Sequence, residues 1–126
     1  MKIFEIIESY SLEDYTTFVL TEQKGSWTVS QTSAYKRAFK KYSRETRVIA
    51  PLEKLLAFIE QYDRPPPVSE YPPEHNVHML QYHSVYDRPL WAHLMGSRIG
   101  LIFKVLPGEI QLLCLGTHDD CKVGKF

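Results

Sequence analysis

The chain has 126 residues, of which 44% are hydrophobic, and its fifteen basic and fifteen acidic residues give no formal net charge. This length and apolar content fit one compact domain with a core of its own. The sequence has no apolar run long enough to span a membrane, and its N-terminus lacks the basic-then-apolar order of a signal peptide. Two cysteines are too few for a disulfide scaffold, so we expect a soluble protein of a reducing compartment, the cytoplasm.

An acidic segment precedes the main part of the chain. Residues 1–26 hold two basic and five acidic residues, a net charge of −3, so residues 27–126 carry +3. Within residues 1–26, Phe18–Thr21 is apolar and β-branched, and just after this segment Trp27–Ser30 alternates like a strand. We predict that residues 1–26 are an extension of a domain formed by residues 27–126. We also predict that this acidic extension folds against, or shields, part of the domain's basic surface.

Two helices are predicted between residues 32 and 62. Thr32 or Ser33 caps the first, which runs to about Tyr42. The second spans roughly Thr46–Tyr62, with a broad apolar stripe and Pro51 near its first turn. A block of basic residues, opposed only by Glu45, follows the first cap: Lys36, Arg37, Lys40, Lys41, Arg44 and Arg47. Such a block is either a solvated helix face or a surface that contacts phosphate groups.

Strands are predicted in the second half of the chain. Five prolines in residues 63–74 end the second helix and form a semi-rigid connector. Asn76–Tyr82 is a candidate strand, and a terminal hairpin joins Ile99–Leu106 to Ile110–Leu115 through a Pro107-Gly108 turn. A strand, two helices and three or four further strands predict an α+β domain. In this domain a two-helix hairpin packs on a small antiparallel β-sheet.

All five histidines lie beyond residue 74. Histidine titrates near neutral pH without help, so the cluster is a candidate site of general acid–base catalysis. His93 just before the terminal hairpin and His118 just after it are expected at the same edge of the sheet. Two alternatives stay open. The loose spacing of His75, His78 and His83 could hold a metal, although no HExxH or CxxC motif is present, or the histidines could be structural.

Other chemistry finds little support in the sequence. It contains no glycine-rich nucleotide loop and no Gly-x-Ser-x-Gly elbow. Cys114 alternates within an apolar run and is predicted to be a core thiol, whereas Cys121 is predicted to lie on the surface. A thiol of this kind, with no group to orient it, is a weak candidate for a nucleophile.

Seven short motifs, in order, resemble the toxins of the bacterial RelE/ParE superfamily, and among them the YafQ-type mRNA interferases. The motifs cover about residues 27–122, and the order and spacing of the last three are the most specific part. They are Trp27-Thr-Val-Ser, Ser33–Lys41, Pro51–Ile59, His78-Met-Leu, Trp91-Ala-His93-Leu, Leu101-Ile-Phe-Lys104 and Gly116-Thr-His118-Asp-Asp.

The resemblance implies a fold like that of microbial RNases and the activity of a type II toxin that cleaves mRNA on the ribosome. In this chemistry a ribose 2′-OH attacks the adjacent phosphate, which requires a base, an acid and donors for the developing charge. By the resemblance, His118 is the general acid, and His78 or His93 is the base or orients the phosphate. Arg98 lies where the sequence departs from the family, at Gly96-Ser97-Arg98, and is our candidate for stabilising the transition-state charge.

The resemblance also implies partners. They are mRNA and ribosomal RNA, contacted by the six basic residues named above together with Lys104 and Lys122, and a cognate antitoxin protein. We expect no metal, no cofactor and no membrane contact. The alternatives are a ParE-like toxin that binds DNA gyrase, a ribosome-independent RNase and an inactive interaction module of the same fold. The three motif histidines favour an RNase, because the ParE branch generally lacks them.

Overall fold

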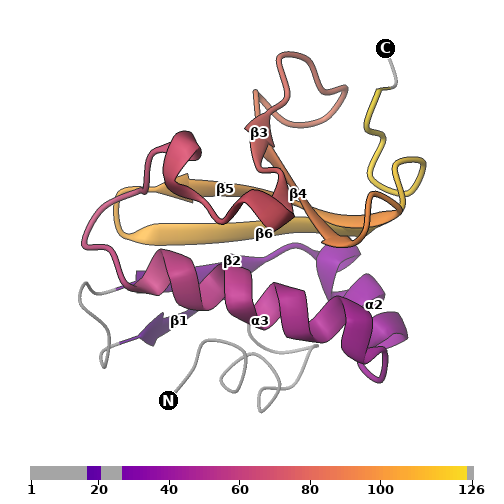
Figure 1. Cartoon of the computed structure of the whole chain (residues 1–126), viewed down its shortest axis with the longest axis horizontal. Helices are drawn as coiled ribbons and strands as arrows, with labels where there is room; N and C mark the ends of the chain where they lie inside the picture. The colour runs from indigo at the N-terminus through magenta and orange to yellow at the C-terminus, as the bar shows by residue number, and fades with distance from the viewer. Residues whose placement is uncertain (1–16, 21–26, 125–126) are drawn as a thin grey trace.

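The computed structural model describes residues 17–20 and 27–124, and Figure 1 shows two helices on one side of a single sheet. The predicted shielding of the basic surface concerns residues outside these ranges, apart from one short strand. The elements are β1 Thr17–Leu20, β2 Trp27–Gln31, α2 Ser33–Tyr42, α3 Thr46–Glu60, the 3-10 turns Val68–Glu70 and Pro73–His75, β3 His78–Met79, β4 Leu90–Met95, β5 Ile99–Leu106 and β6 Glu109–Gly116.

The sheet has six strands in the order β1-β2-β6-β5-β4-β3. The predicted α+β class, with two helices packed on a small sheet, is confirmed. The sheet is mixed and not wholly antiparallel, because β2 and β6 run parallel while the other four pairs are antiparallel. A parallel pair requires a long crossover, and here the two helices and strands β3, β4 and β5 supply it. Part of the predicted extension, β1, pairs with β2 at the edge of this sheet.

The main core lies between the helices and the sheet. Helix α2 contacts β6 and α3 contacts β4, and both helices bury their apolar stripes there. The start of α2 is fixed by Thr32, whose hydroxyl accepts from the Tyr35 N–H at 3.0 Å and donates to the Leu113 carbonyl at 2.6 Å. This one side chain therefore caps the helix, as predicted, and also ties it to β6. No helix in the described ranges is long and apolar enough to cross a membrane.

The predicted strand over Asn76–Tyr82 is shortened to β3, two residues long. Asn76 has a left-handed backbone with φ of 43°, which no strand residue adopts. On the other side Leu80 N–H donates to the Pro89 carbonyl at 2.8 Å, but proline has no N–H to return. The ladder therefore stops, and residues 80–89 form a loop that projects beyond β3 (Figure 1).

A second apolar cluster lies on the sheet face opposite the helices. It consists of Trp91, Ile102, Leu113 and Cys121, with partly buried residues of the β3–β4 loop and of the C-terminal turn packed on it. Among residues 17–20 and 27–124 this small cluster is the only hydrophobic cluster on that face, and polar side chains along its margin are close to solvent. The predicted histidines lie along this margin.

Candidate acid–base site

Trp91 is the centre of the site. It is the second residue of β4 and is 1% exposed, and its ring contacts two imidazoles. The ring centroid of His118 lies 5.0 Å from that of Trp91, and the ring centroid of His93 lies 6.4 Å from it. His78 is the residue paired with Trp91 in the β3–β4 ladder. The three histidines singled out from the sequence therefore come together around one indole.

Gly100 makes room for that indole. It pairs with His93 on one side and with Gly116 on the other. A Cβ atom at this position would lie 2.4 Å from the Trp91 Cζ2 atom and 2.4 Å from the carbonyl oxygen of Ala92. An isolated glycine within a strand often marks such a close approach. The indole therefore lies against bare backbone of β5, and any side chain at this position would displace it.

A capped turn after β6 positions His118. The Asp120 carboxylate accepts from the Thr117 N–H at 3.2 Å, and the Thr117 hydroxyl accepts from the Asp120 N–H at 3.1 Å. The Cys121 N–H also donates to the Thr117 carbonyl at 3.0 Å. This reciprocal pattern is a capping box, which fixes the first turn of a helix-like segment. His118 is the first residue after the cap, so its backbone direction is set by these bonds.

A buried histidine positions His93. The Nδ1 atom of His75 lies 3.1 Å from the His93 carbonyl oxygen, and the ring is 1% exposed. A carbonyl only accepts, so Nδ1 carries the proton. Strand β3 pairs only with Leu90 and Trp91 of β4. The His93 carbonyl lies beyond these pairs, and the imidazole of His75 bonds to it in place of a backbone N–H. We infer that His75 is a positioning residue for His93.

The electrostatics of the site favour a neutral His93. Partial burial of the ring lowers the pKa of His93, and the nearby charges of His78 and His118 lower it further. At neutral pH this imidazole is therefore uncharged and can accept a proton. His78 and His118 are exposed to solvent, where a substrate can reach them.

The lowered pKa predicts a specific titration. We expect the chemical shifts of the His93 ring protons, followed by NMR, to give a pKa below the ordinary value of 6.5. Replacing His118 with Gln should move that midpoint upward, because one repelling charge is removed. Because the folded-state pKa is depressed, the stabilisation from His93 is present above pH 6.5 and is lost as pH falls through the lowered pKa. A titration midpoint of His93 at or above 6.5 would contradict this arrangement, and so would a midpoint that is the same in the His118→Gln variant.

The alternative metal set does not assemble. His75 is buried behind β4, whereas His83 lies between the loop and the C-terminal turn. The Nε2 atom of His83 donates to the Cys121 carbonyl at 2.7 Å, and its Nδ1 atom accepts from the N–H groups of Val85 and Tyr86. Within residues 17–20 and 27–124, no three His, Cys, Asp or Glu side chains are placed to hold one metal ion. His75 and His83 therefore have structural contacts, as one of the alternatives expected.

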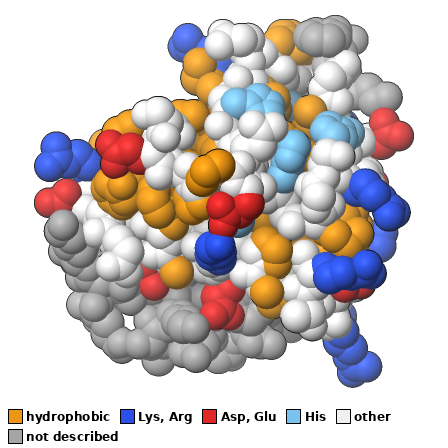
Figure 2. All heavy atoms as spheres, in the orientation of Figure 1, with side chains coloured by type: hydrophobic (Ala, Val, Ile, Leu, Met, Phe, Trp, Pro, Cys, Tyr) orange, Lys and Arg blue, Asp and Glu red, His pale blue; other side chains and the backbone are white. Residues whose placement is uncertain are grey.

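The predicted basic surface divides into separate parts. Arg37 and Lys41, one turn apart on α2, line a cleft of about 250 Å³ with Cys114 and Asp120, next to the turn that carries His118. Figure 2 shows histidine side chains gathered on one area and lysine and arginine side chains near them. Lys36 and Lys40 lie about 100° round the helix from those two positions. Arg44 is exposed in the link after α2, and Arg47 forms a surface ion pair with Glu45 at 3.0 Å.

Three predicted residues remain, and each lies in a different part of the fold. Arg98 is exposed in the β4–β5 turn, which follows the pair His93–Gly100, and its N–H donates to the Met95 carbonyl at 3.2 Å. Lys122 is exposed on the C-terminal turn. Lys104 lies two residues beyond Ile102 along β5, on the same face as the small apolar cluster.

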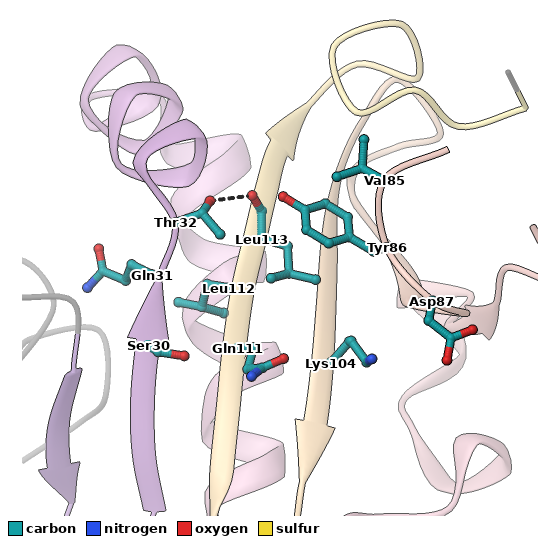
Figure 3. Close-up of a pocket in the computed structure, with 10 residues that line it drawn as sticks. All are labelled: Ser30, Gln31, Thr32, Val85, Tyr86, Asp87, Lys104, Gln111, Leu112 and Leu113. Carbon is teal, nitrogen blue, oxygen red and sulfur yellow. Dashed lines mark hydrogen bonds between the residues drawn. The ribbon is translucent and has the colours of Figure 1, made fainter. Parts of the chain in front are cut away.

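A cavity of about 410 Å³ borders Lys104 (Figure 3). The Tyr86 side chain extends from the β3–β4 loop over the sheet, with its oxygen toward Thr32 and Leu113. Gln111 pairs with Lys104 across β5 and β6 and also lines the cavity. An apolar floor with an amide, an ammonium group and a phenol suits a planar polar ligand.

The burial of the two cysteines is the reverse of the prediction. Cys121 is 2% exposed and belongs to the small apolar cluster, whereas Cys114 is half-buried. The reason is that the capped turn folds back over β6 and carries Cys121 inward. The two sulfur atoms lie 2.9 Å apart as free thiols.

Sequence reasoning missed the residues that support the histidines. They are Trp91, Gly100, His75, Thr117 and Asp120. Two of these features have a readable signal, because Thr-x-x-Asp is a capping pattern and an isolated glycine within a strand indicates close packing. The indole that joins the histidines, and the bond from His75 to a backbone carbonyl, depend on tertiary contacts and have no local signal.

Two helices cover one face of a mixed sheet, and the histidine cluster lies on the other face of this α+β fold. The structure is similar to a chain in the crystal structure of the E. coli DinJ-YafQ toxin-antitoxin complex, with a TM-score of 0.55 and 19% sequence identity. The match covers 72% of this chain and 91% of that chain. No family model matches the sequence, and no curated protein matches it. At this identity the likeness concerns the fold.

Proposed function

We propose that this protein is the toxin of a toxin–antitoxin pair and a ribosome-dependent endoribonuclease that cleaves mRNA without a metal. The observation that carries the proposal is the meeting of His78, His93 and His118 around Trp91 on the helix-free face of the sheet. The fold likeness and the motif resemblance point in the same direction. If the three histidines had a purely structural role, nothing would require His78 and His118 to be exposed to solvent.

The proposed reaction assigns each histidine a step. Neutral His93 takes the proton from a ribose 2′-OH, and the oxygen attacks the adjacent phosphorus. His118 donates a proton to the departing 5′-oxygen, so that a 2′,3′-cyclic phosphate and a 5′-hydroxyl result. His78 orients the phosphate, and Arg98 at the nearby turn stabilises the extra negative charge of the pentacoordinate state. The lowered pKa of His93 supports its assignment as base.

The surroundings offer sites for the rest of the RNA. Trp91 is too deeply buried to stack on a base, so it serves as a rigid floor for the imidazoles. The cavity beside Lys104 and Tyr86 lies further along the same face and could take a neighbouring base. Phosphates that lead away from the site would follow Arg37 and Lys41. This path predicts unequal roles for the basic residues.

We therefore expect the double substitution Arg37→Gln/Lys41→Gln to weaken RNA binding more than the double substitution Lys36→Gln/Lys40→Gln on the same helix. Each lost phosphate contact on single-stranded RNA should reduce the slope of log affinity against log salt by about 0.7. The measurement is a salt titration of binding to a short RNA with a non-cleavable 2′-deoxy linkage. Equal losses in both variants would instead indicate a diffuse charge effect.

The proposed partners follow from this activity. A toxin of this kind acts in the cytoplasm, where ribosomes are, and an antitoxin protein would cover the acid–base cluster or the basic cleft beside it. Expression of the chain tests the activity class, because an mRNA endoribonuclease stops protein synthesis first. A toxin that binds DNA gyrase would raise DNA-damage signalling first, and that order of events would overturn the proposal.

A further inference from the structure

We propose that Cys114 and Cys121 form a redox-active dithiol, and that its oxidation to a disulfide links the turn carrying His118 to strand β6. This site is independent of the proposed nuclease activity, because it rests on the two thiols alone. No motif in the sequence indicated it, since the spacing of seven residues matches no common redox motif.

The geometry brings the two sulfur atoms together. The Cys121 thiol donates to the Cys114 sulfur at 2.9 Å, which is closer than two unbonded sulfur atoms usually approach. A disulfide requires about 2.05 Å between the sulfurs, so a movement of less than 1 Å would suffice. The capped turn holds this arrangement, because the Cys121 N–H donates to the Thr117 carbonyl and His83 donates to the Cys121 carbonyl at 2.7 Å.

The two thiols differ in reactivity. The hydrogen bond from Cys121 lowers the pKa of Cys114 and outweighs the opposing effects of burial and of the Asp120 charge, whereas the same bond and burial raise the pKa of Cys121. Cys114 is also the accessible partner, because it lines the cleft that contains Arg37 and Lys41. Cys114 is therefore the attacking thiolate and Cys121 the resolving thiol.

The oxidation balances with hydrogen peroxide as the oxidant. The Cys114 thiolate attacks one peroxide oxygen, the O–O bond breaks, and a sulfenic acid and hydroxide form. The Cys121 sulfur then attacks the Cys114 sulfur, and the sulfenic oxygen leaves as water with the thiol proton. In total two thiols and one peroxide give one disulfide and two waters. A thiol reductant reverses the change.

The disulfide would close a short loop that contains the cap and His118. Residues 114–121 would form this loop, with Thr117 and His118 inside it. Cross-linking removes freedom mainly from the unfolded chain, and closing a loop of this length should raise the melting temperature by about 10 °C. The oxidised protein should also hold the His118 turn more firmly, which slows hydrogen exchange at the Cys121 and Val123 amides.

The experiment treats the full-length protein with a small excess of hydrogen peroxide, and then with dithiothreitol. Intact mass spectrometry should show a loss of about 2 Da, one linked peptide after digestion, and recovery on reduction. The melting temperature of the same sample should rise on oxidation and fall on reduction. Cys114→Ser and Cys121→Ser should each abolish the mass loss and the reversible shift in melting temperature. The wild-type protein, measured before and after oxidation and again after reduction, is the control for folding.

Three results would overturn the proposal. They are two thiols that stay free under these conditions, a disulfide between two copies of the chain, and oxidation of Cys114 to sulfinic acid without a link to Cys121. Failure of the nuclease proposal would not affect these outcomes, because none of them measures cleavage.

Discussion

Replacing His118 with alanine is expected to lower the rate of mRNA cleavage by about 10²- to 10⁴-fold and to relieve growth arrest on expression. The reason is that in the proposed reaction His118 protonates the departing 5′-oxygen, which without that proton is a poor leaving group. The side chain is exposed apart from its contact with Trp91, so its removal opens no cavity in the core. The measurement is primer extension on an mRNA translated in an extract that contains the purified variant.

The control for this variant is Gln61→Ala. Gln61 is exposed at the end of α3, and its described bonds come from its backbone N–H, so its side chain is expected to have no effect on cleavage. Thermal unfolding of both variants should stay close to that of the wild type, which shows that an inactive His118 variant is folded. A folded His118→Ala protein that still arrests growth would remove this residue from the mechanism.

The substitution Gly100→Ala should have a large effect on both stability and activity. The added methyl group would lie 2.4 Å from the Ala92 carbonyl oxygen, which belongs to the paired strand and cannot move freely. It would also displace the indole of Trp91, and with it the floor on which His118 and His93 rest. Overpacking of this kind destabilises by about 1–3 kcal/mol, and chemical denaturation measures it.

A matched change on the same hairpin is Gly96→Ala. No atom lies within 4 Å of a Cβ atom at Gly96, and only its left-handed φ of 57° opposes the change, at a cost of about 1 kcal/mol. We therefore expect Gly96→Ala to keep its activity at temperatures where it is folded. Gly100→Ala should lose activity even when folded, because the imidazoles are misplaced. A folded and fully active Gly100→Ala protein would show that the indole does not position the histidines.

The parts of the fold that could be predicted from sequence are those fixed by local chemistry. Thr32 predicted the start of α2, the prolines of residues 63–74 predicted the connector, and the Pro107-Gly108 turn predicted the terminal hairpin. His93 precedes this hairpin in the sequence and His118 follows it, and the pairing of the two strands brings both residues to the same end. Their approach to each other was therefore foreseeable, and the structure places both against Trp91.

What could not be predicted depends on contacts between distant segments. The parallel pairing of β2 and β6 depends on where the chain returns after two helices, which no local pattern records. The inward position of Cys121 depends on the fold of the capped turn over β6. The bond from His75 to the His93 carbonyl joins residues eighteen apart in the sequence, and no sequence motif around His75 predicts it. For the same reason Arg98 and most of the basic residues could be selected only by their charge. The sequence did not predict that they lie on separate parts of the surface.

The chemistry of the cleaved ends tests the central claim most directly. Ribosomes translating a defined mRNA would be treated with the purified protein, and the ends of the products would be determined by their response to phosphatase and kinase. Attack by the 2′-OH with histidine acid–base catalysis predicts a cyclic or simple phosphate on the 3′ end and a hydroxyl on the 5′ end, with no products from His118→Ala. Cleavage that leaves a 3′-hydroxyl and a 5′-phosphate, or no cleavage by the wild-type protein, would contradict the account.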